Sequence, residues 1–111
     1  MQVYVFKDRS GRVIRVVFDT ESLCALAYRD DEIVGVLRVE NDAVGAQTSV
    51  RLLSVYVEPA YRRCGIAHTL LAYVCRETGQ SIEIAPVMAS QSLAFAHLCR
   101  CLMQEGVIVA A

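Results

Sequence analysis

The first half of the chain shows the alternating, β-branched apolar pattern of strands separated by polar turns. Residues 3–7 and 12–18 flank residues 8–11, Asp-Arg-Ser-Gly, whose chemistry favours a turn, so they predict a β-hairpin. Residues 23–28 and 33–39 flank a polar stretch and predict a second hairpin. We therefore expect four antiparallel strands before the first helix.

A fifth strand is predicted after a loop. Residues 41–48 combine Asn, Asp, Gly and small side chains, which is typical of a flexible surface loop. In the strand that follows, residues 49–57, Leu53, Val55 and Val57 point to one face, and the other face is also largely apolar. This pattern predicts a central strand that is covered on both sides.

The second half of the chain changes to a helical period. Apolar side chains recur at helical spacing over residues 65–78, and Gly79 can supply the left-handed residue that ends this helix. A short strand is expected at residues 81–85, where Pro86 stops it. Strand, helix and strand in this order form a crossover unit, so residues 49–57 and 81–85 should be parallel neighbours.

A second helix is predicted over residues 90–105, where Gly106 ends it, and a short strand over residues 107–109 can close the chain. This helix is apolar on most sides, with a narrow polar stripe that includes His97. Such a helix is largely buried or lies at a subunit contact, which leaves a homodimer open. Together the elements predict a mixed α/β fold, in which antiparallel N-terminal strands precede a β-α-β-α unit.

Composition narrows the class of protein. The 111 residues fit one domain, residues 1–111, because smaller pieces could not bury cores of their own. Hydrophobic residues make up 55% and charged residues 21%, which excludes a disordered chain. No apolar run approaches the ~20 residues of a membrane-spanning helix, and the N-terminus lacks a signal-peptide pattern, so we expect a soluble cytoplasmic protein.

Charge and cysteine usage argue against nucleic acid, an anionic membrane or a metal ion as a partner. The net charge is −1 and Lys and Arg are spread along the chain, so neither nucleic acid nor an anionic membrane is expected as a partner. The five cysteines form no Cys-x-x-Cys pair and only two histidines could join them, which argues against a metal site. Most cysteines lie inside apolar patterns, as reduced thiols of cytoplasmic proteins do.

The segment after the fifth strand has the order of an anion-binding site. The strand stops at Pro59, the spacing Arg62-x-x-Gly65-x-Ala67 follows, and a helix begins at once. Bare N–H groups at a helix start, small residues that admit a ligand closely, and arginines can together hold a pyrophosphate. The alternative is an ordinary exposed turn in which Gly65 supplies only its backbone conformation. The Walker motif Gly-x-x-x-x-Gly-Lys-Ser/Thr is absent, and the dinucleotide-binding motif is incomplete because its third glycine is missing.

The sequence Val57-x-Pro59-x-Tyr61-Arg62-Arg63-x-Gly65-Ile66-Ala67-x-x-Leu70-Leu71 closely resembles the acetyl-CoA signature of the GCN5-related N-acetyltransferases (GNAT), Gln/Arg-x-x-Gly-x-Gly/Ala. Strand, turn, motif and helix arrive in the order of that family. The resemblance implies a short member of the GNAT superfamily, with acetyl-CoA as cosubstrate. It also implies direct transfer of acetyl to an amine held in a ternary complex.

The resemblance further implies a cofactor site. Backbone groups of Val55 and Val57 would bind the pantetheine arm, and the Val55 N–H would polarise the thioester carbonyl. N–H groups from Arg63 through His68 would bind the pyrophosphate. The cofactor-binding residues so implied are Val55, Tyr56, Val57, Arg62, Arg63, Cys64, Gly65, Ile66, Ala67 and His68.

The chain departs from the family at both expected catalytic positions. Arg51 stands where acetyltransferases of histone lysines carry a glutamate base, and a guanidinium cannot accept a proton. Leu102 stands where many members carry a tyrosine that protonates the leaving thiolate. The neighbouring Cys101, and His97 one turn earlier, are the candidates for that role. Their alternatives are core packing for Cys101 and a surface position for His97.

Three functions remain open. The first is an N-acetyltransferase acting on a primary amine. Two helices that usually shape the acceptor side in this family are missing, and the open face that results favours a lysine or N-terminus of a protein as the acceptor. Its proton acceptor would be Glu40, Glu58, an acid of residues 30–32, or a water. The second is a catalytically inactive CoA-binding or protein-interaction module with a GNAT fold. The third is an interaction protein that uses the apolar last helix at a dimer face.

Overall fold

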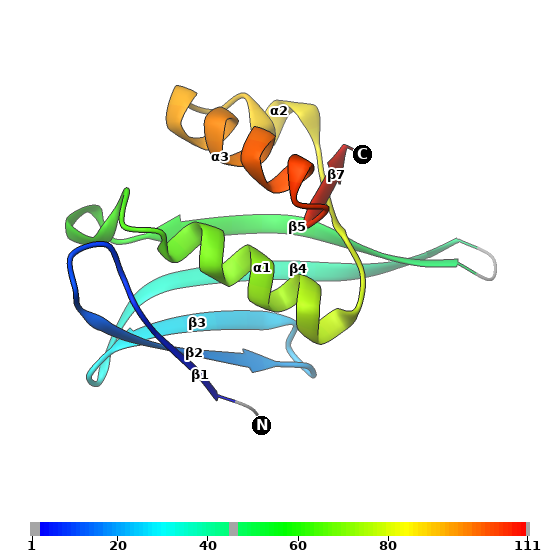
Figure 1. Ribbon diagram of the computed structural model, residues 1–111. Helices are drawn as coiled ribbons and strands as arrows, with labels where there is room; N and C mark the ends of the chain where they lie inside the picture. Colours follow the sequence, from blue (N-terminus) through cyan, green and yellow to red (C-terminus); the bar gives the residue numbers. More distant parts are fainter. Residues whose placement is uncertain (1–2, 45–46, 111) are drawn as a thin grey trace.

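The computed structural model describes residues 3–44 and 47–110. Within them, seven strands form one sheet in chain order, which curls around helix α1, with α2 and α3 beside its last strands (Figure 1). The strands are β1 (Val3–Lys7), β2 (Val13–Asp19), β3 (Cys24–Arg29), β4 (Glu32–Val44), β5 (Gln47–Val57), β6 (Ile82–Ile84) and β7 (Ile108–Ala110). The helices are α1 (Ile66–Thr78), α2 (Pro86–Ala89) and α3 (Leu93–Gln104), with a 3-10 turn at Pro59–Tyr61.

Strand pairing confirms the predicted mixed sheet. Neighbouring strands are antiparallel from β1 to β5 and parallel from β5 to β7, so the expected parallel contact between the fifth and sixth strands is present. No helix in these two described ranges is long and apolar enough to span a bilayer.

The β4–β5 ladder is longer than the sequence predicts. We expected a flexible loop over residues 41–48, but β4 continues to Val44 and β5 starts at Gln47, with these two residues opposite each other. Once two long strands are in register, each further pair adds backbone hydrogen bonds at little additional entropic cost, and this outweighs the loop-like composition. Residues 45–46, which join the strands, lie outside the described residues.

Residues 86–104 contain two helices where the sequence predicts one. Pro86 ends β6 as expected, but it also opens α2, because its fixed φ suits the first position of a helix. α3 starts at Leu93 instead of residue 90, since Ser92 is extended and its Oγ caps the helix by accepting from the Phe95 N–H at 3.0 Å. Leu93 is 92% exposed, and α3 as a whole is less buried than its composition predicts.

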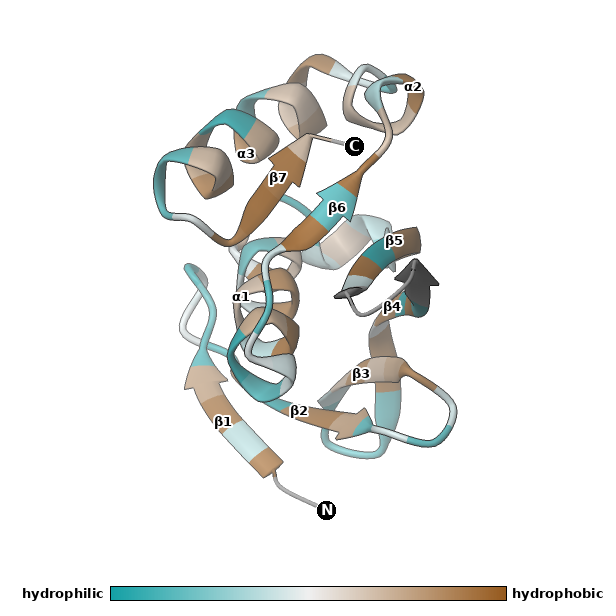
Figure 2. Cartoon of the chain, turned by 90° about the vertical axis from the view of Figure 1, so that its right-hand side faces the viewer, coloured by the Kyte–Doolittle hydropathy of each residue, from teal (hydrophilic) through white to brown (hydrophobic). Residues whose placement is uncertain are grey.

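α1 makes the main apolar contact with the sheet. Its Ile66, Leu70 and Val74 are at most 1% exposed, and Figure 2 shows the sheet curling around this helix. β4 approaches the helix most closely at Gly35, where a Cβ would lie 3.3 Å from Ile66 Cγ2 and 3.3 Å from Ala27 Cβ. A larger residue would push α1 away from the sheet. The start of α1 is therefore held close to β4 and β5.

β5 separates from β6 soon after the two strands meet. Val50 and Arg51 pair with β6, but β5 continues to Val57. A register shift in the β4–β5 ladder leaves Leu53 without an opposite residue, as in a β-bulge. Leu53 is 47% exposed and Tyr56 is 46% exposed, so the outer half of β5 is not covered on both faces as the sequence predicted. This half of the strand is free to form one wall of a site.

Candidate functional site

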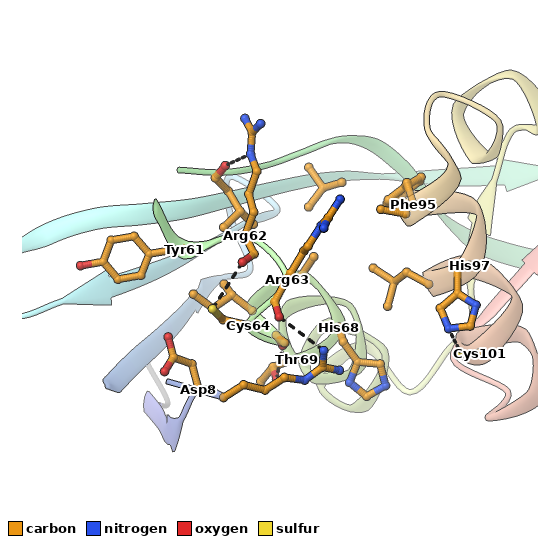
Figure 3. Close-up of a pocket in the computed structure, with 18 of the residues that line it drawn as sticks. Asp8, Tyr61, Arg62, Arg63, Cys64, His68, Thr69, Phe95, His97 and Cys101 are labelled. Atoms are coloured by element: carbon orange, nitrogen blue, oxygen red, sulfur yellow. Dashed lines mark hydrogen bonds between the residues drawn. The ribbon is translucent and has the colours of Figure 1, made fainter. Parts of the chain in front are cut away.

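The separation of β5 from β6 opens a cleft of about 1090 Å³. One wall consists of the outer part of β5 and the loop into α1, and α3 forms the facing wall (Figure 3). The end of β1 and the turn after it, residues 7–9, form a third side. The cleft is lined by every residue that the family resemblance implies for cofactor binding and by the two candidate proton donors: Val55, Tyr56, Val57, Arg62, Arg63, Cys64, Gly65, Ile66, Ala67, His68, His97 and Cys101.

The edge of β5 that faces the cleft carries backbone groups without a strand partner. The Glu58 N–H donates to the Val34 carbonyl on β4 at 2.8 Å, and backbone groups alternate in direction along a strand. Val55 and Val57 therefore direct their N–H and C=O groups away from β4, to the side where β6 has diverged. Here the Val57 carbonyl accepts a hydrogen bond from Arg62 Nε at 2.9 Å. An extended chain that carries amides can pair with such an edge.

The loop into α1 presents a row of backbone N–H groups. Arg63 has φ +60° and Gly65 has φ +89°, so the chain is left-handed at both positions. The Gly65 carbonyl accepts from the Thr69 N–H at 3.0 Å and from its hydroxyl at 2.8 Å. Within the described ranges, no hydrogen bond uses the N–H groups of residues 63–68. Residues 63–68 line the cleft, so this row of free donors at a helix start suits an anion.

The β1–β2 turn is fastened to the same loop. The Arg9 N–H donates to the Cys64 carbonyl at 3.0 Å, and the Arg12 guanidinium lies 3.9 Å from the centre of the Tyr61 ring. Asp8 holds Arg12 in place, since its carboxylate accepts from the Arg12 N–H and from Arg12 Nε, each at 2.9 Å. The hairpin therefore supports the loop from which the N–H groups point.

Asp8 is the charged centre of this support. Its side chain is 0% exposed, and burial raises the pKa of its carboxyl. Hydrogen bonds from Arg12 and Ser10 and the Arg12 charge outweigh burial and hold the pKa of Asp8 below its usual value. No motif in the sequence of this turn indicates a part in the site. The contact between Arg9 and Arg63 joins residues 54 positions apart, and such a contact leaves no periodic signal in the sequence.

α3 brings Cys101 and His97 to the cleft and keeps Leu102 in the core. Cys101 Sγ lies 3.7 Å from His97 Nε2, and both side chains line the cleft. Leu102 is 0% exposed and does not line it. Near the end of α3, the Glu105 carboxylate lies 3.0 Å from His68 Nε2 and joins the two helices across the cleft. Glu105 belongs to no sequence motif, and only the fold brings it to the cleft.

The carboxylates considered as proton acceptors lie away from the cleft. Glu40 forms an ion pair with Arg51 at 3.5 Å, and neither residue lines the cleft. Glu58 and the acids of residues 30–32 do not line it either. Of the described residues, the acids that line the cleft are Asp8 and Glu105.

Comparison with known proteins adds the family. Residues 3–98 match the family model described as the Acetyltransferase (GNAT) family. Among solved structures, Arabidopsis thaliana Naa50 in complex with the bisubstrate analogue CoA-Ac-MVNAL is 25% identical, with a TM-score of 0.47, over 52% of this chain and 39% of its own. The acetyltransferase from Vibrio fischeri is 21% identical, with a TM-score of 0.45, over 55% of this chain and 57% of its own.

This chain therefore matches less than two thirds of the length of either of these structures. No curated protein matches the sequence. The family match, in contrast, extends from β1 into the first half of α3 and ends at residue 98, before Cys101. The chain belongs to the GNAT family of acetyltransferases.

Proposed function

We propose that the protein is an acetyl-CoA-dependent N-acetyltransferase acting on a primary amine. The observation that carries the proposal is that two sets of backbone groups without a backbone partner, at the β5 edge and at residues 63–68, open into one cleft. The β5 edge suits the amides of a pantetheine arm. The N–H row suits a pyrophosphate. The cleft thus fits acetyl-CoA as the cosubstrate.

In this arrangement the thioester lies beside Val55. The Val55 N–H, which points away from β4, donates to the thioester oxygen and stabilises the negative charge that develops there when the amine attacks. The Val57 carbonyl has a second lone pair beside the one that accepts from Arg62, so it can also accept from a pantetheine amide. The new C–N bond forms as the C–S bond breaks, and CoA leaves as a thiolate.

We propose that Cys101 donates the proton that this thiolate takes up. Its side chain lies on the α3 wall, across the cleft from the loop into α1 (Figure 3). His97 Nε2 is 3.7 Å from Cys101 Sγ, and His97 is exposed, so it can return a proton from solvent to the Cys101 thiolate that this step leaves.

The acceptor that the cleft favours is the α-amine of a protein N-terminus over a lysine side chain. Of the two acids that line the cleft within the described ranges, Asp8 is paired with Arg12 and Glu105 is hydrogen-bonded to His68, and we assign the proton of the amine to water. The ordinary pKa is about 7.7–8.0 for an α-amine and about 10.4 for lysine. A much larger fraction of N-termini is therefore uncharged and nucleophilic at neutral pH.

Calorimetric titration with acetyl-CoA and an assay for released CoA thiol test this proposal. We expect saturable binding and faster release with a peptide that has a free N-terminus than with one whose only amine is a lysine. Gly65→Glu should abolish binding, because it adds a negative charge to the segment that would bind the phosphates. Gly65→Ala is the matched control, since it imposes the same left-handed strain while its Cβ meets nothing within 4 Å. Equal binding by wild type and Gly65→Glu would contradict the proposed site.

A CoA-binding module without transfer activity is the second candidate. It is favoured by Arg51, which stands at the expected base position and is held between Glu40 at 3.5 Å and Glu83 at 3.9 Å. Intact-mass spectrometry of peptides incubated with acetyl-CoA separates the two candidates. An acetyl adduct that requires the protein excludes the module without activity.

The cytoplasmic location, the exclusion of nucleic acid and membrane partners and the possible homodimer stay predictions. Cell fractionation tests the location. Light scattering tests the assembly.

A further inference from the structure

The β1–β2 turn does more than support the loop into α1, because it also lines the cleft. Lys7, Asp8 and Arg9 form its third side. Arg9 is exposed, and its Nη1 donates to the Arg63 carbonyl at 3.3 Å. This bond uses one of the five donors of a guanidinium. The rest of the group lies beside the residues whose N–H groups face the cleft.

The charges along this side are unbalanced. Of the acids nearby, Asp8 is paired with Arg12 at 2.9 Å, and Glu105 lies at the far side of the cleft, where it is hydrogen-bonded to His68 at 3.0 Å. Among the described side chains, no carboxylate lies within ion-pair distance of Lys7, Arg9 or Arg63. Like charges that share a cleft repel one another in the free protein, and a bound anion relieves this repulsion. The cluster is therefore suited to a ligand with several negative charges.

We propose that Arg9 is a phosphate-binding residue of the cofactor site, supplied by the β1–β2 hairpin. This inference rests on the proposed function, and it adds to the site a segment that lies far from the signature in sequence. The Arg9 N–H bond to the Cys64 carbonyl at 3.0 Å fixes the turn against the loop, so the guanidinium meets the ligand from a preorganised position. A planar guanidinium can hold two phosphate oxygens at once.

The test is the affinity of the whole chain for CoA and for 3′-dephospho-CoA, measured calorimetrically with wild type, Arg9→Gln and Arg9→Lys. Arg9→Gln keeps a donor for the Arg63 carbonyl but removes the charge, and it should weaken CoA binding about tenfold. Arg9→Lys keeps the charge but lacks the planar guanidinium that can hold two oxygens, so it should recover part of the affinity. Arg100→Gln is the matched control, because Arg100 is exposed on α3 and does not line the cleft.

The two ligands show which phosphate Arg9 binds. A loss with CoA alone assigns Arg9 to the 3′-phosphate, and an equal loss with both ligands assigns it to the pyrophosphate. Affinities of Arg9→Gln that match those of Arg100→Gln for both ligands would overturn this inference alone, with wild-type binding intact. Failure of wild type to bind either ligand would overturn the proposed function as well. If Arg9→Gln does not fold, Arg9→Met takes its place, because it also removes the charge, and wild-type affinity of that variant for both ligands overturns the inference.

Discussion

At the scale of single residues, Cys101 separates catalysis from binding. If its thiol protonates the leaving thiolate, Cys101→Ala should lower kcat about 100-fold and leave the Kd for acetyl-CoA nearly unchanged. Steady-state kinetics and calorimetry measure the two quantities. Cys24→Ala is the control, because Cys24 is half-buried on β3 and does not line the cleft. An unchanged kcat in Cys101→Ala would assign the proton to water or to another group.

The same residue shows what the sequence could and could not predict. The turn and helix start over residues 62–68 were predictable, because the signature is local, and their part in cofactor binding stays a prediction. The sequence could not decide whether Leu102 or Cys101 faces the cleft, because successive residues of a helix point in directions about 100° apart. The packing of α3 decides it by burying Leu102 and turning Cys101 to the cleft.

At the scale of elements, the β1–β2 hairpin should lose stability when Asp8 loses its charge. Asp8→Asn weakens the bonds to Arg12 and should lower the free energy of unfolding by about 1–3 kcal/mol at neutral pH. The pKa of Asp8 is lower in the folded state than its usual value, so its contribution is complete above about pH 4. The contribution disappears as the pH falls through the folded-state pKa. Urea unfolding at neutral and acidic pH measures both effects.

The free energies of unfolding of wild type and Asp8→Asn should become equal at acidic pH. Wild type and Asp8→Asn differ at neutral pH, and the difference should shrink as Asp8 becomes protonated. Asp31→Asn is the control, since Asp31 is exposed in the turn before β4. A difference between wild type and Asp8→Asn that stays constant down to the acid limit would show that the charge of Asp8 does not stabilise the hairpin.

Elements differ in how far the sequence determines them. α1 spans residues 66–78, close to the predicted 65–78, because a helical period and a glycine cap both mark it. The ends of β4 and β5 depend on pairing between strands, which composition does not encode, and the predicted loop at residues 41–48 was therefore wrong. The Ser92 cap of α3 is a local signal, but it competes with an apolar pattern that also fits the residues before it.

At the scale of the whole molecule, the cleft exists because segments from both ends of the chain meet. The turn after β1, the outer half of β5, the start of α1 and the face of α3 all line it. Of these four segments, only the end of β5 and the start of α1 carry the family signature. Local sequence therefore predicts a part in a cofactor site only for these two. The contribution of the turn depends on contacts between distant residues, such as Arg9 with Cys64, and emerges only when the sheet is assembled.

Because its site joins these segments, acetyl-CoA should stabilise the whole fold. A ligand that binds only the folded chain, at about 100 times its Kd, adds about 2.7 kcal/mol to the free energy of unfolding. For a chain of this size that corresponds to a rise in Tm of roughly 10 °C, which differential scanning fluorimetry measures. Gly65→Glu should show no rise at the same ligand concentration. Hydrogen exchange locates the effect, and we expect added protection in the β1–β2 turn and in α3 as well as at residues 63–68. Protection confined to residues 63–68 would mean that the ligand lies on the loop without entering the cleft, and the assignment of the opposite wall to catalysis would fail.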